Sequence, residues 1–162
     1  MRIFLPVLLI VILFSITGCD ETRIYETNKD FKGNDWFIDS VASFSFEIKD
    51  ATSDYNILTN VRNAISYPFA NLYIKYTLLD SNNKKIDGKL LRLPLFDKKS
   101  GKPYGDGLGD IFDHQFTLLK GHKFQEPGVY KVRIKQYMRQ DPLPFIMSVG
   151  VRVEKAEGEN QE

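Results

Sequence analysis

Cysteine is nearly absent from this chain, since Cys19 is the only one among 162 residues. A single cysteine excludes an intramolecular disulfide and any C-x-x-C metal or redox motif. Histidine is almost as scarce, and His114 and His122 stand in no recognisable metal-ligand spacing. The sequence also contains no G-x-S-x-G, P-loop or H-E-x-x-H motif. We therefore predict a protein that is not an enzyme, with no catalytic residues, no cofactor and no metal site.

A long apolar run is missing as well. The longest one, Ile3–Phe14, is interrupted only by Pro6 and is shorter than the roughly 20 apolar residues that span a bilayer. It follows Arg2, the only charged residue before Cys19. A basic residue followed by roughly 7–15 apolar residues is typical of a secretory signal. We predict a signal peptide over residues 1–18.

The signal is followed by Ile-Thr-Gly-Cys at residues 16–19. This stretch resembles the lipobox of bacterial lipoproteins and predicts cleavage between Gly18 and Cys19, with acylation of Cys19. The alternative is an ordinary small-residue cleavage site beside a cysteine. Acylation would remove an unpaired thiol that is a liability in an oxidising compartment, and two or more acyl chains hold a protein on a membrane almost permanently. We expect a lipid-anchored cell-envelope protein whose partners include the lipid bilayer.

Two residues bear on which membrane the lipoprotein is sorted to. Asp20 and Glu21 follow the cysteine, where residues bear on lipoprotein sorting. The outer membrane is favoured, and its periplasmic or surface face is left open.

An excess of either charge is also lacking. The chain has 22 basic and 21 acidic residues, and loss of Arg2 with the signal leaves the two in balance. Nucleic-acid binding is therefore not expected. The remaining length suits one domain: we predict a lipidated cysteine and polar tether over 19–33, a folded domain over 34–155, and a disordered acidic tail over 156–162.

The predicted domain is rich in aromatic residues and in apolar residues that alternate with polar ones, a pattern typical of half-buried strands. Turn residues lie at 50–54, at 80–83, where they indicate a hairpin, and at 126–128, and Pro94 confines its strand to an edge or an end. The positions that define the predicted strands are Ala42, Phe44, Phe46 and Ile48; Tyr55, Ile57, Thr59 and Val61; Leu72, Ile74, Tyr76 and Leu78; Ile86, Lys89, Leu91, Leu93 and Leu95 in a less regular strand; Phe112, His114, Phe116 and Leu118; Tyr130, Val132 and Ile134; and residues 146–153.

No window shows a capped helical period, so we predict an all-β fold: an antiparallel β-sandwich of about seven strands, immunoglobulin-like or related. Residues 127–130, Pro-Gly-Val-Tyr, resemble the tyrosine corner of such sandwiches. In that motif the phenol bonds back to upstream backbone. The alternative for Tyr130 is a plain core tyrosine.

The glycine-rich segment 105–110 could be mistaken for a phosphate loop. A dinucleotide site needs a helix after such a loop, whereas the residues that follow have a strand pattern. Calcium held by Asp106, Asp110 and Asp113 is a minor alternative. We expect a plain turn whose glycines adopt positive φ. If residues 112–118 form a strand, Asp113 and His114 point to opposite faces and cannot act as a catalytic pair.

Aromatic, methionine and arginine side chains that are exposed are enriched at protein interfaces, so such residues are the candidates for partner contacts. The candidates are Trp36, Arg62, Tyr67, Met138 and Arg139. For Trp36 a place in the core is favoured over a contact surface. A proline-stiffened loop over 139–144 is a suitable place for such a surface. A separate candidate is O-glycosylation of Ser40 within Asp-Ser-Val, for which the alternative is an unmodified serine at a strand entry.

Several separate stretches, taken together and in order behind the lipobox, are distinctive. They are Asp39-Ser40 with Phe44-Ser45-Phe46; Tyr55-Asn56 with Val61-Arg62-Asn63; Tyr67-Pro68-Phe69 with Asn71-Leu72; Gly107-Leu108-Gly109-Asp110-Ile111; Gly128-Val129-Tyr130; Gln136-Tyr137-Met138-Arg139; and Val149-Gly150-Val151-Arg152. They cover most of the chain from about Trp36 to Glu154, and together they resemble the GldH gliding-motility lipoprotein family of Bacteroidota.

The resemblance implies a non-catalytic cell-envelope lipoprotein needed for gliding, working with other gliding lipoproteins and with type IX secretion. A different function class is left open by the residues themselves. An aromatic-rich sandwich with loops between its strands could also be an envelope-anchored ligand-binding module, for example one that binds glycans.

Overall fold

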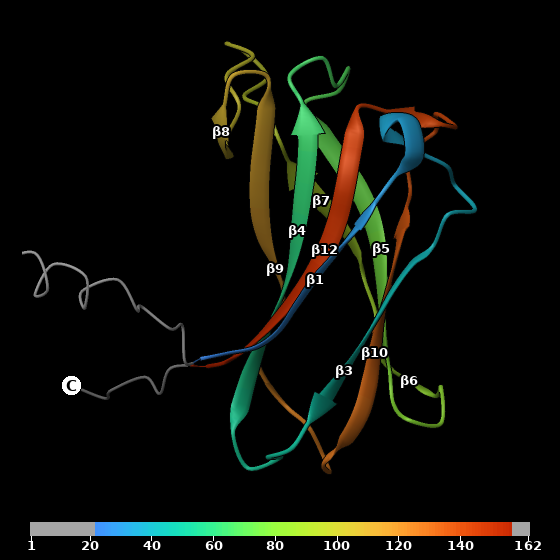
Figure 1. The fold of residues 1–162 in the computed structure, drawn as a ribbon, viewed down its shortest axis with the longest axis vertical. Coiled ribbons are helices and arrows are strands. Elements are labelled where there is room, and N and C mark those ends of the chain that lie inside the picture. The colour runs from blue at the N-terminus through green and yellow to red at the C-terminus, as the bar shows by residue number, and fades with distance from the viewer. Residues whose placement is uncertain (1–21, 157–162) are drawn as a thin grey trace, which may run out of the picture.

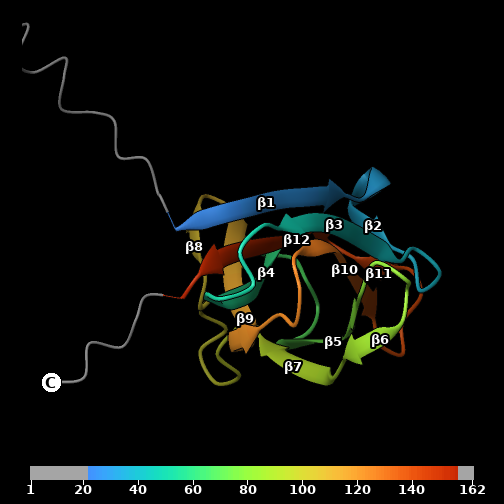
Figure 2. The same ribbon diagram turned by 90° about the horizontal axis from the view of Figure 1, so that it is seen from below.

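The computed structural model describes residues 22–156, so the predicted signal peptide, Cys19 and residues 157–162 lie outside the described residues. Two antiparallel sheets pack face to face in this part of the chain (Figures 1 and 2). The prediction of an antiparallel β-sandwich is confirmed. Among residues 22–156, no helix is long and apolar enough to cross a membrane.

The first sheet, here called the β4 sheet, has the strand order β1-β12-β4-β9-β8. The second, the β10 sheet, has the order β3-β10-β5-β6, and β7 also pairs with β5. The 3-10 turn η1 (Lys32–Asn34) leads into β2 (Asp35–Trp36). β2 pairs with β11 (Leu143–Pro144) in a separate two-stranded sheet. The strands of the β4 sheet are β1 (Arg23–Asp30), β12 (Ile146–Lys155), β4 (Asp54–Ala64), β9 (Ile111–Lys123) and β8 (Asp106–Leu108). Those of the β10 sheet are β3 (Ala42–Ile48), β10 (Gly128–Gln136), β5 (Asn71–Leu79), β6 (Lys85–Asp87) and β7 (Leu90–Pro94).

The core lies between the two sheets and is built from the alternating apolar positions of the strands. Burial in β3 alternates strictly from Ala42 to Ile48, and β4 and β5 bury the side chains that the pattern selects. Fully burying one large apolar side chain, such as Ile57, Leu78 or Ile134, contributes about 1.5–3 kcal/mol. The predicted strands are therefore confirmed where alternation is strongest.

The predicted tether over 19–33 is wrong for its larger part. Residues 23–30 form β1, which pairs antiparallel with β12 from Arg23 opposite Glu154 to Asp30 opposite Ser148. Its polar sequence hides a strand because β1 is a sheet edge whose residues are mostly exposed. Lys29, at a half-buried position, spans to the other sheet and donates from Nζ to the Val41 carbonyl at 3.1 Å. The sandwich thus begins at least as early as Arg23.

The turns serve the topology in different ways. Residues 50–54 connect β3 to β4 and carry the chain from one sheet to the other. The cluster at 80–83 closes the predicted hairpin between β5 and β6, with Leu79 opposite Lys85. Pro94 is the last residue of β7, which pairs only with β5 among the described strands, as expected for a proline at an edge.

The predicted glycine-rich connection over 97–110 contains the short strand β8, which no sequence signal indicated. Gly109 has the expected positive φ of 68°. Gly105 and Gly107 instead allow close approach to β9, because a Cβ there would collide with the carbonyl oxygens of Asp113 and Ile111. Small size, not backbone conformation, is what these two positions require.

Tyr130 forms the predicted tyrosine corner. Its ring is buried, and its hydroxyl donates to the Glu126 carbonyl at 2.8 Å, four residues upstream. Burial raises the pKa of this phenol. The tyrosine-corner and core interpretations of the sequence are thus both correct.

Replacing Tyr130 by Phe is expected to lower the free energy of unfolding by about 0.5–1.5 kcal/mol, because the Glu126 carbonyl loses the hydrogen bond from the phenol. Urea unfolding measures the change. Tyr137→Phe is the matched control, since no hydrogen bond of that hydroxyl is seen among residues 22–156 and its ring is exposed. Equal unfolding midpoints for both variants would contradict a stabilising corner.

Candidate functional site

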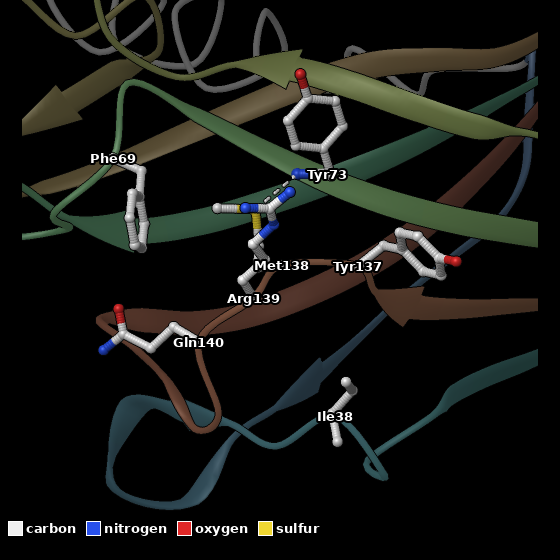
Figure 3. Close-up of a pocket in the computed structure, with 7 residues that line it drawn as sticks. All are labelled: Ile38, Phe69, Tyr73, Tyr137, Met138, Arg139 and Gln140. Carbon is white, nitrogen blue, oxygen red and sulfur yellow. Dashed lines mark hydrogen bonds between the residues drawn. The ribbon is translucent and has the colours of Figure 1, made fainter.

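Two of the five predicted contact residues, Met138 and Arg139, line an apolar pocket at one end of the sandwich (Figure 3). Three segments that are far apart in the sequence build it: the loop after β2, the entry to β5, and the segment after β10. Its lining residues are Ile38, Phe69, Tyr73, Tyr137, Met138, Arg139 and Gln140. We call this the aromatic pocket.

Backbone and side-chain bonds hold the pocket wall in place. Tyr137 N–H donates to the Tyr73 carbonyl at 2.8 Å, and Tyr73 N–H donates to the Met138 sulfur at 3.3 Å. Figure 3 shows the thioether lying beside Tyr73 with this bond drawn. Met138 N–H donates to Gln136 Oε1 at 2.8 Å, and Gln136 is fully buried. A methionine is usually adaptable, but here both its backbone and its sulfur are bonded.

The fully buried Gln136 also fixes the far side of the same turn. Its Nε2 donates to the Gln140 carbonyl at 3.3 Å. Ile38 N–H donates to Asp141 Oδ1 at 2.8 Å, which ties the loop after β2 to the segment after β10. The pocket is therefore preformed.

Large apolar side chains remain open to solvent around this rigid frame. The exposed fraction is 57% for Tyr137 and 37% for Tyr73. Rigid aromatic rings next to an arginine and a methionine are the residue types enriched at protein interfaces. The arrangement can bind an apolar side chain of a partner, and it brings together no pair of groups suited to acid–base chemistry.

Two other candidate contacts, Trp36 and Tyr67, lie in the core. The favoured core interpretation of Trp36 is therefore correct, and the surface contact proposed for Tyr67 is wrong. Trp36 is fully buried, stacks on Phe31 at 4.8 Å between ring centroids, and donates from its indole N–H to the Ser40 carbonyl at 2.8 Å. Tyr67 is 5% exposed and packs edge-on against Phe69 at 5.7 Å. Burial raises its pKa strongly. Tyr67 therefore supports the pocket from behind.

Arg62, the fifth candidate, is exposed but lies on the outer face of the β4 sheet, away from the aromatic pocket. Its guanidinium donates twice to Asp113, at 2.8 and 2.9 Å, from adjacent strands. This bidentate bond raises the pKa of Arg62. The pair borders a shallow polar depression lined by Glu26, Asn28, Asn60, Asp106, Gln115 and Ser148, among others.

His114 borders the polar depression, whereas His122 lines neither this depression nor the aromatic pocket. His114 is buried beneath Gly105, with its ring parallel to Phe116 at 6.0 Å, and its Nε2 has no partner among residues 22–156. Asp113 and His114 do point to opposite faces, one exposed and one buried. His122 packs edge-on against Phe124 at 4.7 Å. Within the described residues, Asp106, Asp110 and Asp113 form no cluster that could hold a metal ion.

Stability is expected to fall as the pH drops below the ordinary histidine pKa of about 6.5. Burial lowers the pKa of both His114 and His122, with Asp113 and Asp106 partly opposing it at His114. The unfolded chain therefore binds more protons in this window, so the free energy of unfolding decreases with falling pH. Melting temperatures measured from about pH 7.5 to about pH 5 test this.

The double variant His114→Gln/His122→Gln is the control, and its melting temperature should vary less over the same window. Asp50 acts in a different window, because hydrogen bonds from Ser53 and Thr52 lower its pKa, so its contribution is lost only below the ordinary aspartate pKa of about 3.9. A wild-type melting temperature that is constant above about pH 5 would contradict the role of the histidines.

Ser40 lies half-buried in the loop between β2 and β3, where its N–H donates to the Phe37 carbonyl at 2.9 Å. Its O-glycosylation stays a prediction, which an intact-mass measurement of the mature protein would test.

Sequence reasoning missed most of the aromatic pocket. Tyr73 carried one usable signal, because it occupies an outward position between the inward Leu72 and Ile74, where a large ring has no core to enter. Phe69 and Ile38 carried no such signal, whereas Gln140 lies in the loop over 139–144 that was expected to offer a contact surface. Their convergence depends on loop conformations that strand periodicity does not specify.

Comparison with known proteins adds a family match. The model of the GldH lipoprotein family matches residues 23–153. The chain is 31% identical over 154 residues to a gliding motility lipoprotein GldH homolog of Christiangramia forsetii, covering 91% of each chain. It is 32% identical over 153 residues to the gliding motility lipoprotein GldH of Flavobacterium johnsoniae, covering 90% of this chain and 91% of the relative.

Similarity to solved structures is weak. A subviral particle of infectious bursal disease virus VP2 aligns with a TM-score of 0.36 and 14% identity, covering 84% of this chain and 31% of that one. A bacteriophage CBA120 tailspike domain aligns with a TM-score of 0.32 and 10% identity, covering 82% of this chain and 17% of that one. These values support no functional argument.

Proposed function

The chain belongs to the GldH lipoprotein family, and from that premise we propose that it is a non-catalytic interaction component of the gliding motility machinery, linked to type IX secretion. The observation that carries the proposal is the preformed aromatic pocket, which leaves Tyr73, Tyr137 and Met138 available to a partner. The lipid on Cys19 holds the domain at the outer membrane.

The position of the pocket relative to the anchor supports this role. Only residues 20–22 separate Cys19 from Arg23, and the four Cα–Cα steps between these two residues span at most about 14 Å. β1 then runs for eight residues, about 26 Å, to the end of the sandwich where β2, β11 and the loops of the pocket lie. The aromatic pocket is thus at the end remote from the start of β1, where a partner standing off the membrane can reach it.

Deletion of the gene tests the function. We expect loss of surface spreading and of secretion of type IX cargo, both restored by the wild-type gene. A gene carrying Tyr73→Asp should fail to restore them, because a charge in the pocket opposes apolar contact. Tyr104→Asp is the matched control, since Tyr104 is exposed and lies outside the pocket. A deletion strain that spreads and secretes normally would overturn the proposal.

A second candidate function is glycan binding, favoured by the polar depression beside Arg62. Its amide and carboxylate side chains, among them Asn28, Asn60 and Gln115, project from neighbouring strands of one sheet face. Such groups hydrogen-bond to sugar hydroxyls. Binding of the lipoprotein to a glycan array, lost in Asn60→Leu, would support this alternative.

A further inference from the structure

The outer face of the β10 sheet carries a concentration of positive charge that the balanced composition of the chain does not reveal. Outward positions are those that alternate with the buried ones along each strand. Five of them hold cations on three adjacent strands, and we call these residues the basic face: Lys75 of β5, Arg92 of β7, and Lys131, Arg133 and Lys135 of β10.

This concentration of like charges lowers the stability of the folded domain. Lys135 and Lys75 are register partners on neighbouring strands, and like charges placed directly opposite one another destabilise a sheet. Among residues 22–156, no ion pair involves a member of the basic face. The nearest compensation is the hydrogen bond from Lys131 Nζ to Asn83 Oδ1 at 3.0 Å.

On the opposite outer face of the sandwich, two outward arginines are paired with carboxylates. On the β4 sheet, Arg62 bonds to Asp113, and Arg152 bonds to Glu154 and Glu26. On the three adjacent strands β3, β10 and β5, Glu47 is the only acidic residue at an outward position. Among residues 22–156, the outward cations of the basic face therefore lack the carboxylate partners that Arg62 and Arg152 have on the β4 sheet.

The basic face is continuous with two hollows. At one end, Lys131 and Arg133 line a recess with Ser43 and Asn83. At the other, Tyr73 lies opposite Arg92 in the register of β5 and β7 and belongs to the aromatic pocket, where Arg139 adds a further cation. Cations thus extend from a polar recess to an apolar pocket along a single side of the molecule.

We propose that the basic face docks an acidic protein surface whose apolar side chain enters the aromatic pocket. The proposal rests on the proposed function, since it takes the pocket as a partner site, and it adds the chemistry of the partner. Complementary charge directs association and excludes partners with basic surfaces. The apolar side chain buried in the aromatic pocket contributes most of the binding energy.

A protein fits this face better than an anionic bilayer does. A bilayer presents no side chain to a pocket walled by Tyr73, Tyr137 and Met138. The strand that leads to the lipid, β1, belongs to the β4 sheet, whereas the basic face points outward from the other sheet (Figure 2). The basic face is therefore on the side of the sandwich that the anchor leaves free.

Photo-cross-linking in living cells tests the proposal with the full lipoprotein. A photoreactive residue replaces Thr77, which lies outward beside Arg133 in the register of β5 and β10. The control position is Thr117, outward on β9 of the other sheet. We expect a protein adduct from position 77 that position 117 does not give, formed with a partner whose contact surface is acidic. Ser45, outward on β3, provides a second position if the Thr77 variant does not accumulate.

Charge reversal makes the result specific. Lys75→Glu/Lys135→Glu should lower the yield of the adduct at least about tenfold, whereas Lys75→Arg/Lys135→Arg should keep it. Lysine substitutions in the acidic surface of the cross-linked partner should restore the yield with the Glu variant. Melting temperatures of the variants verify that each one folds.

Several results would overturn the docking surface. In the cross-linking experiment, these results are adducts with lipid alone, the same adducts from positions 77 and 117, or no adduct from any outward position of the β10 sheet. In the charge-reversal experiment, the contradicting result is an adduct yield that does not change with the Glu substitutions. The proposed function fails separately: a deletion strain that spreads and secretes normally, while the charge-dependent adduct still forms, would refute the motility role and leave the acidic partner standing.

Discussion

Replacing Trp36 by Ala is expected to lower the free energy of unfolding by about 3–5 kcal/mol, the range for truncating a large buried aromatic side chain. The ring is fully buried, stacks on Phe31 and bonds to the Ser40 carbonyl. It also sits in β2 opposite Leu143 of β11, so its loss removes the packing that holds together the two loops of the aromatic pocket. Urea unfolding of the wild type and the variant measures the effect.

Two further variants separate packing from hydrogen bonding at this site. Trp36→Phe keeps an aromatic ring against Phe31 but removes the indole donor, so its cost should be smaller, about 1–3 kcal/mol. Phe37→Ala is the control for the neighbouring position, because Phe37 is 52% exposed and surface changes usually stay within about 0.5 kcal/mol. An unfolding midpoint of Trp36→Ala equal to that of the wild type would contradict the placement of the ring.

The sequence predicts the sandwich where alternation is strict. In β3 the apolar side chains Phe44, Phe46 and Ile48 alternate with Ser45 and Glu47. One buried face and one solvated face leave a single pairing register that hides all the apolar groups. That physical constraint is local, so it can be read from consecutive residues.

The same constraint is absent from β1, which is why it was mistaken for a tether. Its half-buried positions include Tyr25 and Lys29, and a lysine can cover apolar surface with its stem while its ammonium reaches a polar group. Here that group is the Val41 carbonyl. A strand that completes a sheet edge with such side chains has no apolar alternation to detect.

The candidate site is predictable only in parts. Met138 and Arg139 were expected to contact a partner, and the structure places both in one pocket. For Trp36 the favoured core position is correct and the alternative surface contact is wrong, but its contacts with Phe31 and Leu143 are known only from the fold. The basic face needed register as well: the alternation of Lys131, Arg133 and Lys135 is visible in the sequence, but their position next to Lys75 is not.

Replacing Cys19 by Ala is expected to abolish lipid attachment and, with it, surface spreading. Cys19 is the only cysteine, so no other thiol can accept the acyl chains. Each buried methylene contributes on the order of 0.8 kcal/mol, and two or more chains are needed for a stable anchor. Metabolic labelling with an alkyne fatty acid should mark the wild type and not the variant, and intact mass should show that residues 1–18 are retained.

Loss of the anchor should also remove the orientation on which the proposed partner contact depends. With only residues 20–22 between Cys19 and β1, a lipid on Cys19 would hold the start of β1 close to the membrane and leave the aromatic pocket at the far end. Thr17→Ser keeps a small residue before the cleavage site and should be labelled, processed and functional. Fatty-acid labelling of Cys19→Ala, or normal spreading of an unlabelled variant, would show that the anchor is not what places the domain.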